Sequence, residues 1–195
     1  MKKERLVAFT DAILAIIMTI LVLDLDKPSE PSLQAFWSLR TSFFSYILSF
    51  FWLGSMWVAL NSIWEKAEII NNKVVWWNLF LLFLAPLIPY ATSLCGNYFD
   101  NRVIQAFYGI VVILMTACNY CLHGSLAKAD KDNTELQEAV KAYQEMLLPD
   151  IFLKILALVL SLLVYPPIMM YGVLISAAYV LTRKHRYEVK THHSL

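Results

Sequence analysis

The stretch RLVAFTDAILAIIMTILVLDL, residues 5–25, decides the fold of this chain. It is an apolar run of membrane length that carries two charges near its start, Arg5 and Asp11. Crossing a hydrocarbon core about 30 Å thick takes roughly 20 apolar residues in a helix, and a charge inside that span costs about 3 kcal/mol. Residues 5–25 therefore predict a transmembrane helix, and its charges are candidate functional residues.

The composition extends this prediction to the whole chain. Of the 195 residues, 59% are hydrophobic and only 16% are charged, which is more apolar than a soluble domain of this size. The formal net charge of +1 gives no information about partners, because the basic residues are segregated along the chain. We expect no nucleic acid ligand. The partner that the composition does indicate is the lipid bilayer.

Apolar runs of this kind recur along the chain. Measured against bilayer thickness, they predict an all-α integral membrane protein of one domain, residues 1–195, with six transmembrane helices per subunit. The last two runs are separated by Tyr165-Pro166-Pro167, where two prolines cannot continue a helix, so we expect a tight hairpin. A single long kinked helix is the alternative. The predicted spans are residues 6–25, 36–63, 75–94, 103–122, 151–164 and 167–181.

Basic residues gather on one side of these spans. Most lysines and arginines fall on the side of the N-terminus, whereas Lys27, Arg40 and Arg102 fall opposite. Because basic residues beside short loops are retained in the cytoplasm, we expect a multi-pass protein of the cell (plasma) membrane with both termini cytoplasmic.

The segment 127–148 is the most soluble-looking part of the chain. Its apolar residues Leu136, Val140, Tyr143 and Leu147 are spaced by four, three and four positions, which is typical of an amphipathic helix. We expect a cytoplasmic amphipathic linker that lies against the bundle or the lipid headgroups.

The first span has two distinct faces. At about 100° per residue, Thr19 lies beside Ile16, and Asp11 lies nearly opposite Phe9. Arg5 and Asp11 point in directions about 120° apart, so each needs a partner on another helix or another subunit. One face is an apolar stripe, made of Phe9, Ile13, Ile16, Ile20 and Leu23.

This apolar stripe has two interpretations. It can face lipid or a packed neighbour, as in any membrane helix. Alternatively, several copies of the helix surround an axis, and Ile16, Ile20 and Leu23 then form stacked apolar rings that gate ions by wetting and dewetting. Thr19 would add hydroxyl oxygens to that zone. The residues alone leave both interpretations open.

A longer pattern resembles a known family. Arg5, followed after three residues by Phe9-Thr10-Asp11, resembles the R-x-x-x-F-S-D signature of the transmembrane protein 175 family of potassium channels, with threonine in place of serine. The likeness continues in Trp57, Trp77-Asn78-Leu79, Leu87-Ile88-Pro89, Gly96 and Tyr98.

The resemblance implies a homotetramer whose first helix lines the pore, without the TVGYG filter of ordinary potassium channels. It implies pore or gate roles for Ile16, Thr19, Ile20 and Leu23. It also implies that Arg5, Phe9, Thr10 and Asp11 form the motif that holds the helices together. One departure is that Leu60 and Asn61 stand where the family pattern leads us to expect a pair of histidines.

Acidic residues follow the first span. Several copies of Asp24 and Asp26 would form an outer vestibule that raises the local cation concentration. The alternative is a solvated loop that ends the span.

The remaining polar positions indicate no enzyme. Cys118, Cys121 and His123 lack a second ligand pair for a metal site, and we expect Lys154 to snorkel toward the headgroups. We therefore predict a potassium-favouring cation channel without metal or cofactor, in which potassium, and with it other monovalent cations, permeates passively. A secondary transporter and a non-conducting scaffold or accessory subunit are the alternatives.

Overall fold

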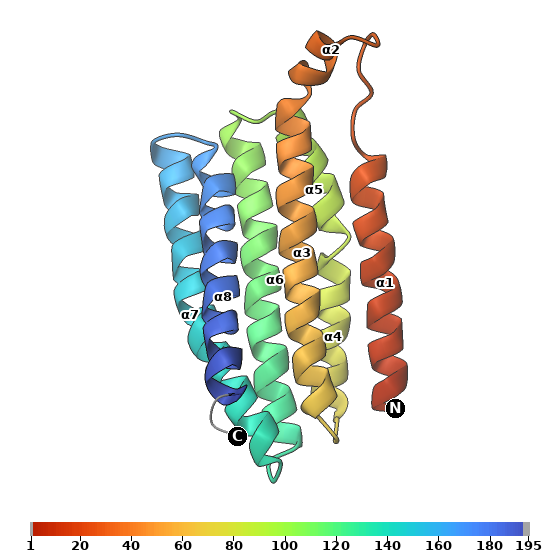
Figure 1. The fold of residues 1–195 in the computed structure, drawn as a ribbon, viewed down its shortest axis with the longest axis vertical. Coiled ribbons are helices and arrows are strands. Elements are labelled where there is room, and N and C mark those ends of the chain that lie inside the picture. Colours follow the sequence, from red (N-terminus) through yellow and green to blue (C-terminus); the bar gives the residue numbers. More distant parts are fainter. Residues whose placement is uncertain (1, 193–195) are drawn as a thin grey trace.

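Eight α-helices make up the described part of the chain, residues 2–192 of a computed structural model with side chains through Arg183. The long helices run along one common axis, and the two ends of the chain lie at the same end of the bundle (Figure 1). The helices are α1 (Lys3–Leu23), α2 (Leu33–Ser38), α3 (Arg40–Lys66), α4 (Asn72–Leu84), α5 (Leu87–Asn97), α6 (Arg102–Ala129), α7 (Thr134–Leu163) and α8 (Ile168–His192).

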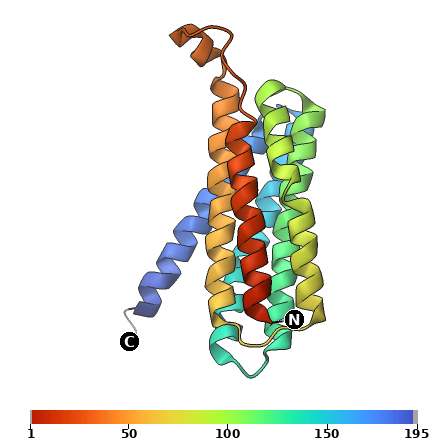
Figure 2. The same cartoon turned by 90° about the vertical axis from the view of Figure 1, so that its right-hand side faces the viewer.

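The prediction of an all-α membrane protein is confirmed. Five stretches in the described residues are long and apolar enough to cross a bilayer: α1, α3, α6, α7 and the α4–α5 pair taken together as Asn72–Asn97. A shorter apolar stretch, Ile168–Arg183, occupies α8, which leaves the bundle toward its C-terminal end (Figure 2).

Two helix boundaries differ from the predicted spans. The predicted span 36–63 begins too early, because Ser32 caps the short helix α2 by accepting a hydrogen bond from the Ala35 amide, and the long helix begins only at Arg40. The predicted span 75–94 is divided at Pro86, which has no backbone N–H to donate and cannot continue α4.

The predicted amphipathic linker is not a separate element. The end of α6 takes up its first residues, and the remainder is the first half of α7, a continuous helix that passes through Pro149. Asn133 starts α7 by accepting a hydrogen bond from the Leu136 amide at 3.0 Å. The predicted apolar face is buried, so this half of α7 packs against the bundle.

The predicted hairpin is present. Helix α7 ends at Leu163 and α8 begins at Ile168, and the Ser161 hydroxyl donates to the Pro166 carbonyl at 2.6 Å across the turn. Gly172 lets the two helices approach closely, because a Cβ atom there would lie only 2.3 Å from Cβ of Ala157.

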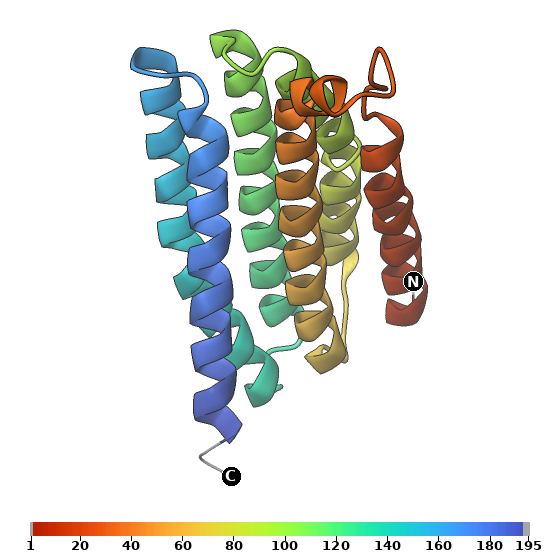
Figure 3. The same ribbon diagram turned by 45° about the horizontal axis from the view of Figure 1, so that its top comes forward.

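The apolar core draws on all the long helices and contains buried polar links between α3, α5 and α6. Tyr108 is fully buried, and its hydroxyl lies 3.2 Å from that of Ser49, which also accepts from Thr92 at 2.7 Å. Helix α1 lies at one edge of the bundle, and the α7–α8 hairpin lies at the other (Figure 3). One side of α1 is therefore left without a neighbour from its own chain.

Candidate functional site

Helix α1 contacts its own chain along a single face. Only 28% of its most apolar 18-residue window is buried, compared with 56% for the window in Asn72–Asn97. This buried face lies beside the apolar stripe and consists of different residues. Its members are Leu6, Thr10, Leu14, Ile17 and Leu21.

Most of the apolar stripe projects away from the subunit. Phe9, Ile16 and Leu23 are 50%, 58% and 78% exposed, and Ile20 is half-buried. Ile13 is also half-buried and packs against the core of its own subunit. Thr19 is also exposed, and its hydroxyl donates to the Ile16 carbonyl of the same helix at 2.7 Å. Donation to the backbone leaves the Thr19 oxygen facing outward among the apolar side chains.

Thr10 joins α1 to α4. It is 1% exposed, and its hydroxyl donates to the Leu6 carbonyl at 2.8 Å while accepting from Asn78 Nδ2 at 2.8 Å. Asn78 is itself fully buried. The hydroxyl at position 10 thus accepts from a buried side-chain amide of another helix, and serine has the same hydroxyl.

Asp11 joins α1 to α3. Its carboxylate accepts a hydrogen bond from the indole N–H of Trp57 at 2.9 Å. Asp11 therefore has a partner on another helix, as the sequence predicted, and this partner belongs to the same subunit. Arg5 is exposed, and none of the side chains that the structure describes forms a hydrogen bond or an ion pair with it.

The N-terminal turn of α1 is tied to the α3–α4 connection. Lys3 donates to the carbonyls of Ala67 at 2.6 Å and Trp64 at 3.3 Å. The same connection is held from the other side by Asp130, whose carboxylate accepts from the Glu68 amide at 2.8 Å. These bonds fix the position of α1 at the end of the bundle that holds both termini.

The far end of α1 carries the predicted acidic residues. The helix ends at Leu23, and both Asp24 and Asp26 are exposed in the segment that follows. The amide of Asp24 donates to the Ile20 carbonyl at 3.1 Å, and Asp24 and Asp26 line a small hollow beside α3 and α5.

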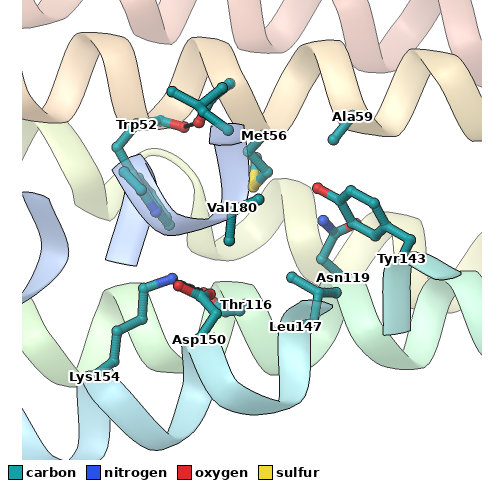
Figure 4. A pocket seen from close by; sticks show the side chains of 13 residues that line it. Trp52, Met56, Ala59, Thr116, Asn119, Tyr143, Leu147, Asp150, Lys154 and Val180 are labelled. Carbon is teal, nitrogen blue, oxygen red and sulfur yellow. Dashed lines mark hydrogen bonds and ion pairs between the residues drawn. The ribbon is translucent and has the colours of Figure 1, made fainter. Parts of the chain in front are cut away.

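Lys154 does not snorkel, in contrast to the prediction. It is 2% exposed and forms an ion pair with the equally buried Asp150 at 2.5 Å, as the close-up of this region shows (Figure 4). The ammonium also donates to Thr116 at 3.0 Å and lies 5.5 Å from the ring centre of Trp52. The sequence does contain a signal for this pair, because residues four apart on a helix, such as Asp150 and Lys154, are neighbours on one face.

A small cavity adjoins this ion pair. It has a volume of about 40 Å³ and lies between α3, α6, α7 and α8. Asp150 Oδ1 and Asn119 Oδ1 are buried there without a hydrogen-bond partner among the described residues. Tyr143 closes one side of it (Figure 4).

The described residues include no group of three His, Cys, Asp or Glu side chains placed to hold a metal. Cys118 is buried, and its thiol donates to the Trp77 carbonyl at 3.3 Å. Leu60, at one of the two positions where histidine was expected, packs in the apolar core.

Comparison with known proteins identifies the family. A family profile described as the endosomal/lysosomal potassium channel TMEM175 matches residues 5–89. A potassium channel of a Chryseobacterium species is 34% identical over 140 residues, which cover 72% of this chain and 73% of that relative. This chain belongs to the TMEM175 family.

Other TMEM175 relatives are more distant. The endosomal/lysosomal proton channel TMEM175 of Danio rerio is 27% identical over 122 residues, which cover 59% of this chain but 22% of that protein. The crystal structure of a lysosomal potassium-selective channel TMEM175 homolog from Chamaesiphon minutus has the same fold. Its TM-score is 0.78 at 22% identity, and the match covers 93% of this chain and 97% of that one.

The part of the chain that matches the TMEM175 profile holds the two bonds that join α1 to its neighbours. Residues 5–89 include Thr10 and Asp11 on α1 and their partners Asn78 on α4 and Trp57 on α3. Two of the four predicted motif residues are therefore bonded to other helices of the same subunit.

Proposed function

We propose that this chain is the subunit of a potassium-favouring cation channel, and that the apolar stripe of α1 lines its pore. One observation carries the proposal: the motif residues Thr10 and Asp11 are bonded to α4 and α3, while Ile16 and Leu23 project away from the subunit. A helix held on one side and uncovered on the other is suited to lining a shared axis. The names of the relatives agree with this function.

In the proposed assembly, four six-span subunits place α1 around the axis. Ile16, Ile20 and Leu23 then form successive apolar rings, which block ions when the constriction is dry and pass them when it is wetted. Thr19 contributes a hydroxyl oxygen between these rings. Passive conduction of this kind needs no cofactor.

Charges lie at both ends of this proposed pore. Asp24 and Asp26 form an acidic outer vestibule, because α1 ends directly below them. Arg5 is exposed at the opposite end and finds its partner on a neighbouring subunit. The predominance of basic residues at the end that holds the termini supports a plasma-membrane protein with both termini in the cytoplasm.

The proposal is tested by substituting stripe residues and measuring potassium flux. Purified wild-type protein and the Ile16→Asn and Leu23→Asn variants are reconstituted into liposomes with a potassium gradient and no other driving ion. Because asparagine wets an apolar constriction, both variants are expected to change the flux several-fold. Val22→Asn is the matched control, since Val22 is 48% exposed on the same helix but outside the stripe.

The outcomes separate the candidate functions. Unchanged flux in both stripe variants, or an equal change in Val22→Asn, overturns the pore assignment. Saturable flux that requires a counter-ion identifies a transporter, and absence of flux from the wild type identifies a scaffold. Cross-linking in the membrane reports the number of subunits.

A further inference from the structure

A groove separate from the proposed pore runs along the outside of the bundle. It lies between α4, α6 and α7, at the end of the bundle that holds both termini, and encloses about 600 Å³. This volume falls within the range of sites that bind small molecules. Its lining includes Trp77, Tyr120, Gly124, Lys128, Lys131 and Gln144.

The polarity of the groove changes along its length. Lys128 and Lys131 are exposed at the end of α6, where the span meets the headgroups. Tyr120 lies about 12 Å further into the span, because eight residues of α-helix rise 1.5 Å each. Trp77 of α4 also lines the groove. Charged groups at the outer end and aromatic rings toward the hydrocarbon match the order of groups in a phospholipid.

The charge of the groove favours an anion. Lys128 and Lys131 are its only charged lining residues, and neither forms an ion pair with any side chain that the structure describes. Lys66, at the same end of the bundle, is instead paired with Glu135. Lys128 and Lys131 also line an adjoining hollow with Glu68, Asp130, Asp132 and Glu135, but none of these carboxylates lines the groove itself.

Small residues keep the groove open. Gly124 lines the groove, and a Cβ atom there would lie 3.0 Å from Gln144 Nε2. Gln144 also lines the groove and donates to the Tyr120 carbonyl at 3.2 Å, which ties its side chain to α6. A larger side chain at position 124 would project into the space that a ligand occupies.

We propose that this groove binds an anionic phospholipid. The phosphate lies between Lys128 and Lys131, the glycerol backbone passes Gly124, and an acyl chain follows Trp77 and Tyr120. Basic pockets between transmembrane helices at a cytoplasmic surface recognise anionic headgroups in this way. The site is independent of α1, so it stands whether or not the apolar stripe conducts ions.

The binding constant is measured by native mass spectrometry of purified protein titrated with phosphatidylglycerol or phosphatidylcholine. Wild-type protein is expected to bind phosphatidylglycerol several-fold more tightly. The Lys128→Gln/Lys131→Gln variant is expected to bind phosphatidylglycerol about 25-fold more weakly, because each lysine contributes roughly a factor of five. Its affinity for phosphatidylcholine is expected to stay unchanged.

Two further variants separate the groove from general surface charge. Lys2→Gln/Lys73→Gln removes two exposed lysines from the same end of the bundle but outside the groove, and it should bind like the wild type. Gly124→Leu fills the groove without changing charge and should weaken phosphatidylglycerol binding as strongly as the double lysine variant. Thermal unfolding of each variant verifies that the fold is retained.

Three results would overturn the proposal. One is equal loss of affinity in Lys2→Gln/Lys73→Gln, which indicates attraction to any surface lysine. Another is full binding by Gly124→Leu, which excludes the groove as the place of binding. The third is displacement of phosphatidylglycerol by millimolar inorganic phosphate, which identifies a site for free phosphate instead of a lipid.

Discussion

The indole N–H of Trp57 on α3 donates to the Asp11 carboxylate on α1 across 2.9 Å. Asp11 is thus bonded inside its own subunit, on a different face from the apolar stripe. Together with the Thr10–Asn78 bond and the buried apolar face of α1, this bond holds the helix in the rotation that leaves Ile16 and Leu23 exposed.

Loss of the Trp57–Asp11 bond should weaken the attachment of α1 to α3. Trp57→Phe removes the donor and Asp11→Ala removes the acceptor, and each is expected to lower the free energy of unfolding by about 1 kcal/mol. The double variant should be less destabilised than the sum, with a coupling of about 1 kcal/mol in detergent unfolding measurements. Strict additivity of the two single effects would contradict the bond.

Thr10→Val should be more harmful than its small change in shape suggests. Valine keeps the volume but leaves the buried Asn78 amide without its acceptor, at a cost of about 1–3 kcal/mol. Thr10→Ser is the matched control, since it keeps the hydroxyl and loses only a methyl group. Thermal unfolding in detergent should rank wild type and Thr10→Ser close together and Thr10→Val well below; equal destabilisation of the two variants would argue against the hydroxyl's role.

Neutralising the proposed vestibule should reduce conductance in a salt-dependent way. Asp24→Asn/Asp26→Asn removes the charge that concentrates cations at the mouth of the pore. The conductance of single channels should fall several-fold at about 20 mM KCl and little at about 1 M, where the Debye length shrinks to roughly 3 Å. Asp100→Asn, at the same end of the bundle but in the α5–α6 connection, should have no such effect. Loss of conductance that is independent of salt would point to a structural cause.

Removing one partner of the buried Asp150–Lys154 ion pair should destabilise the fold more than removing both. Lys154→Met leaves a buried carboxylate without its counter-charge, and Asp150→Asn leaves a buried ammonium, each at a cost of about 3–5 kcal/mol. The double variant Asp150→Asn/Lys154→Met buries no net or unpaired charge and should unfold at a higher temperature than either single variant. A double variant as unstable as the worse single variant would show that the pair stabilises the fold by itself.

Asp130 should make a contribution to stability that is lost in acid. The Glu68 amide, with smaller contributions from Asn133, Ile69 and Lys3, holds the pKa of this carboxyl below its ordinary value of 3.8. A lowered pKa in the folded state stabilises the protein above the unfolded pKa, and the effect disappears as the pH falls through the folded pKa.

The stability difference between wild type and Asp130→Asn should therefore be constant from about pH 8 to about pH 5 and shrink below about pH 4. Asp132→Asn, which changes an exposed neighbour, should show no difference across this range. A difference that grew on acidification would show that the carboxyl is held in its protonated form.

The sequence by itself determined the membrane class and the order of the apolar runs, because transfer of a helix into hydrocarbon depends on its composition and length. It also determined the hairpin at residues 165–167 and the buried side of residues 136–147, since proline chemistry and helical period act locally. The apolar stripe, too, is a property of spacing within one helix.

Only the tertiary structure decided what the polar residues of α1 contact. The partners Trp57 and Asn78 lie 46 and 68 residues away from Asp11 and Thr10, and helical period cannot determine which residue on another helix faces them. The same holds for Lys154. Its position in the sequence predicted that its ammonium would reach the headgroups, but in the folded chain it is buried against Trp52 and paired with Asp150. Inside the bilayer a polar group takes the hydrogen-bond partner that the neighbouring helices offer, and the fold determines which partner that is.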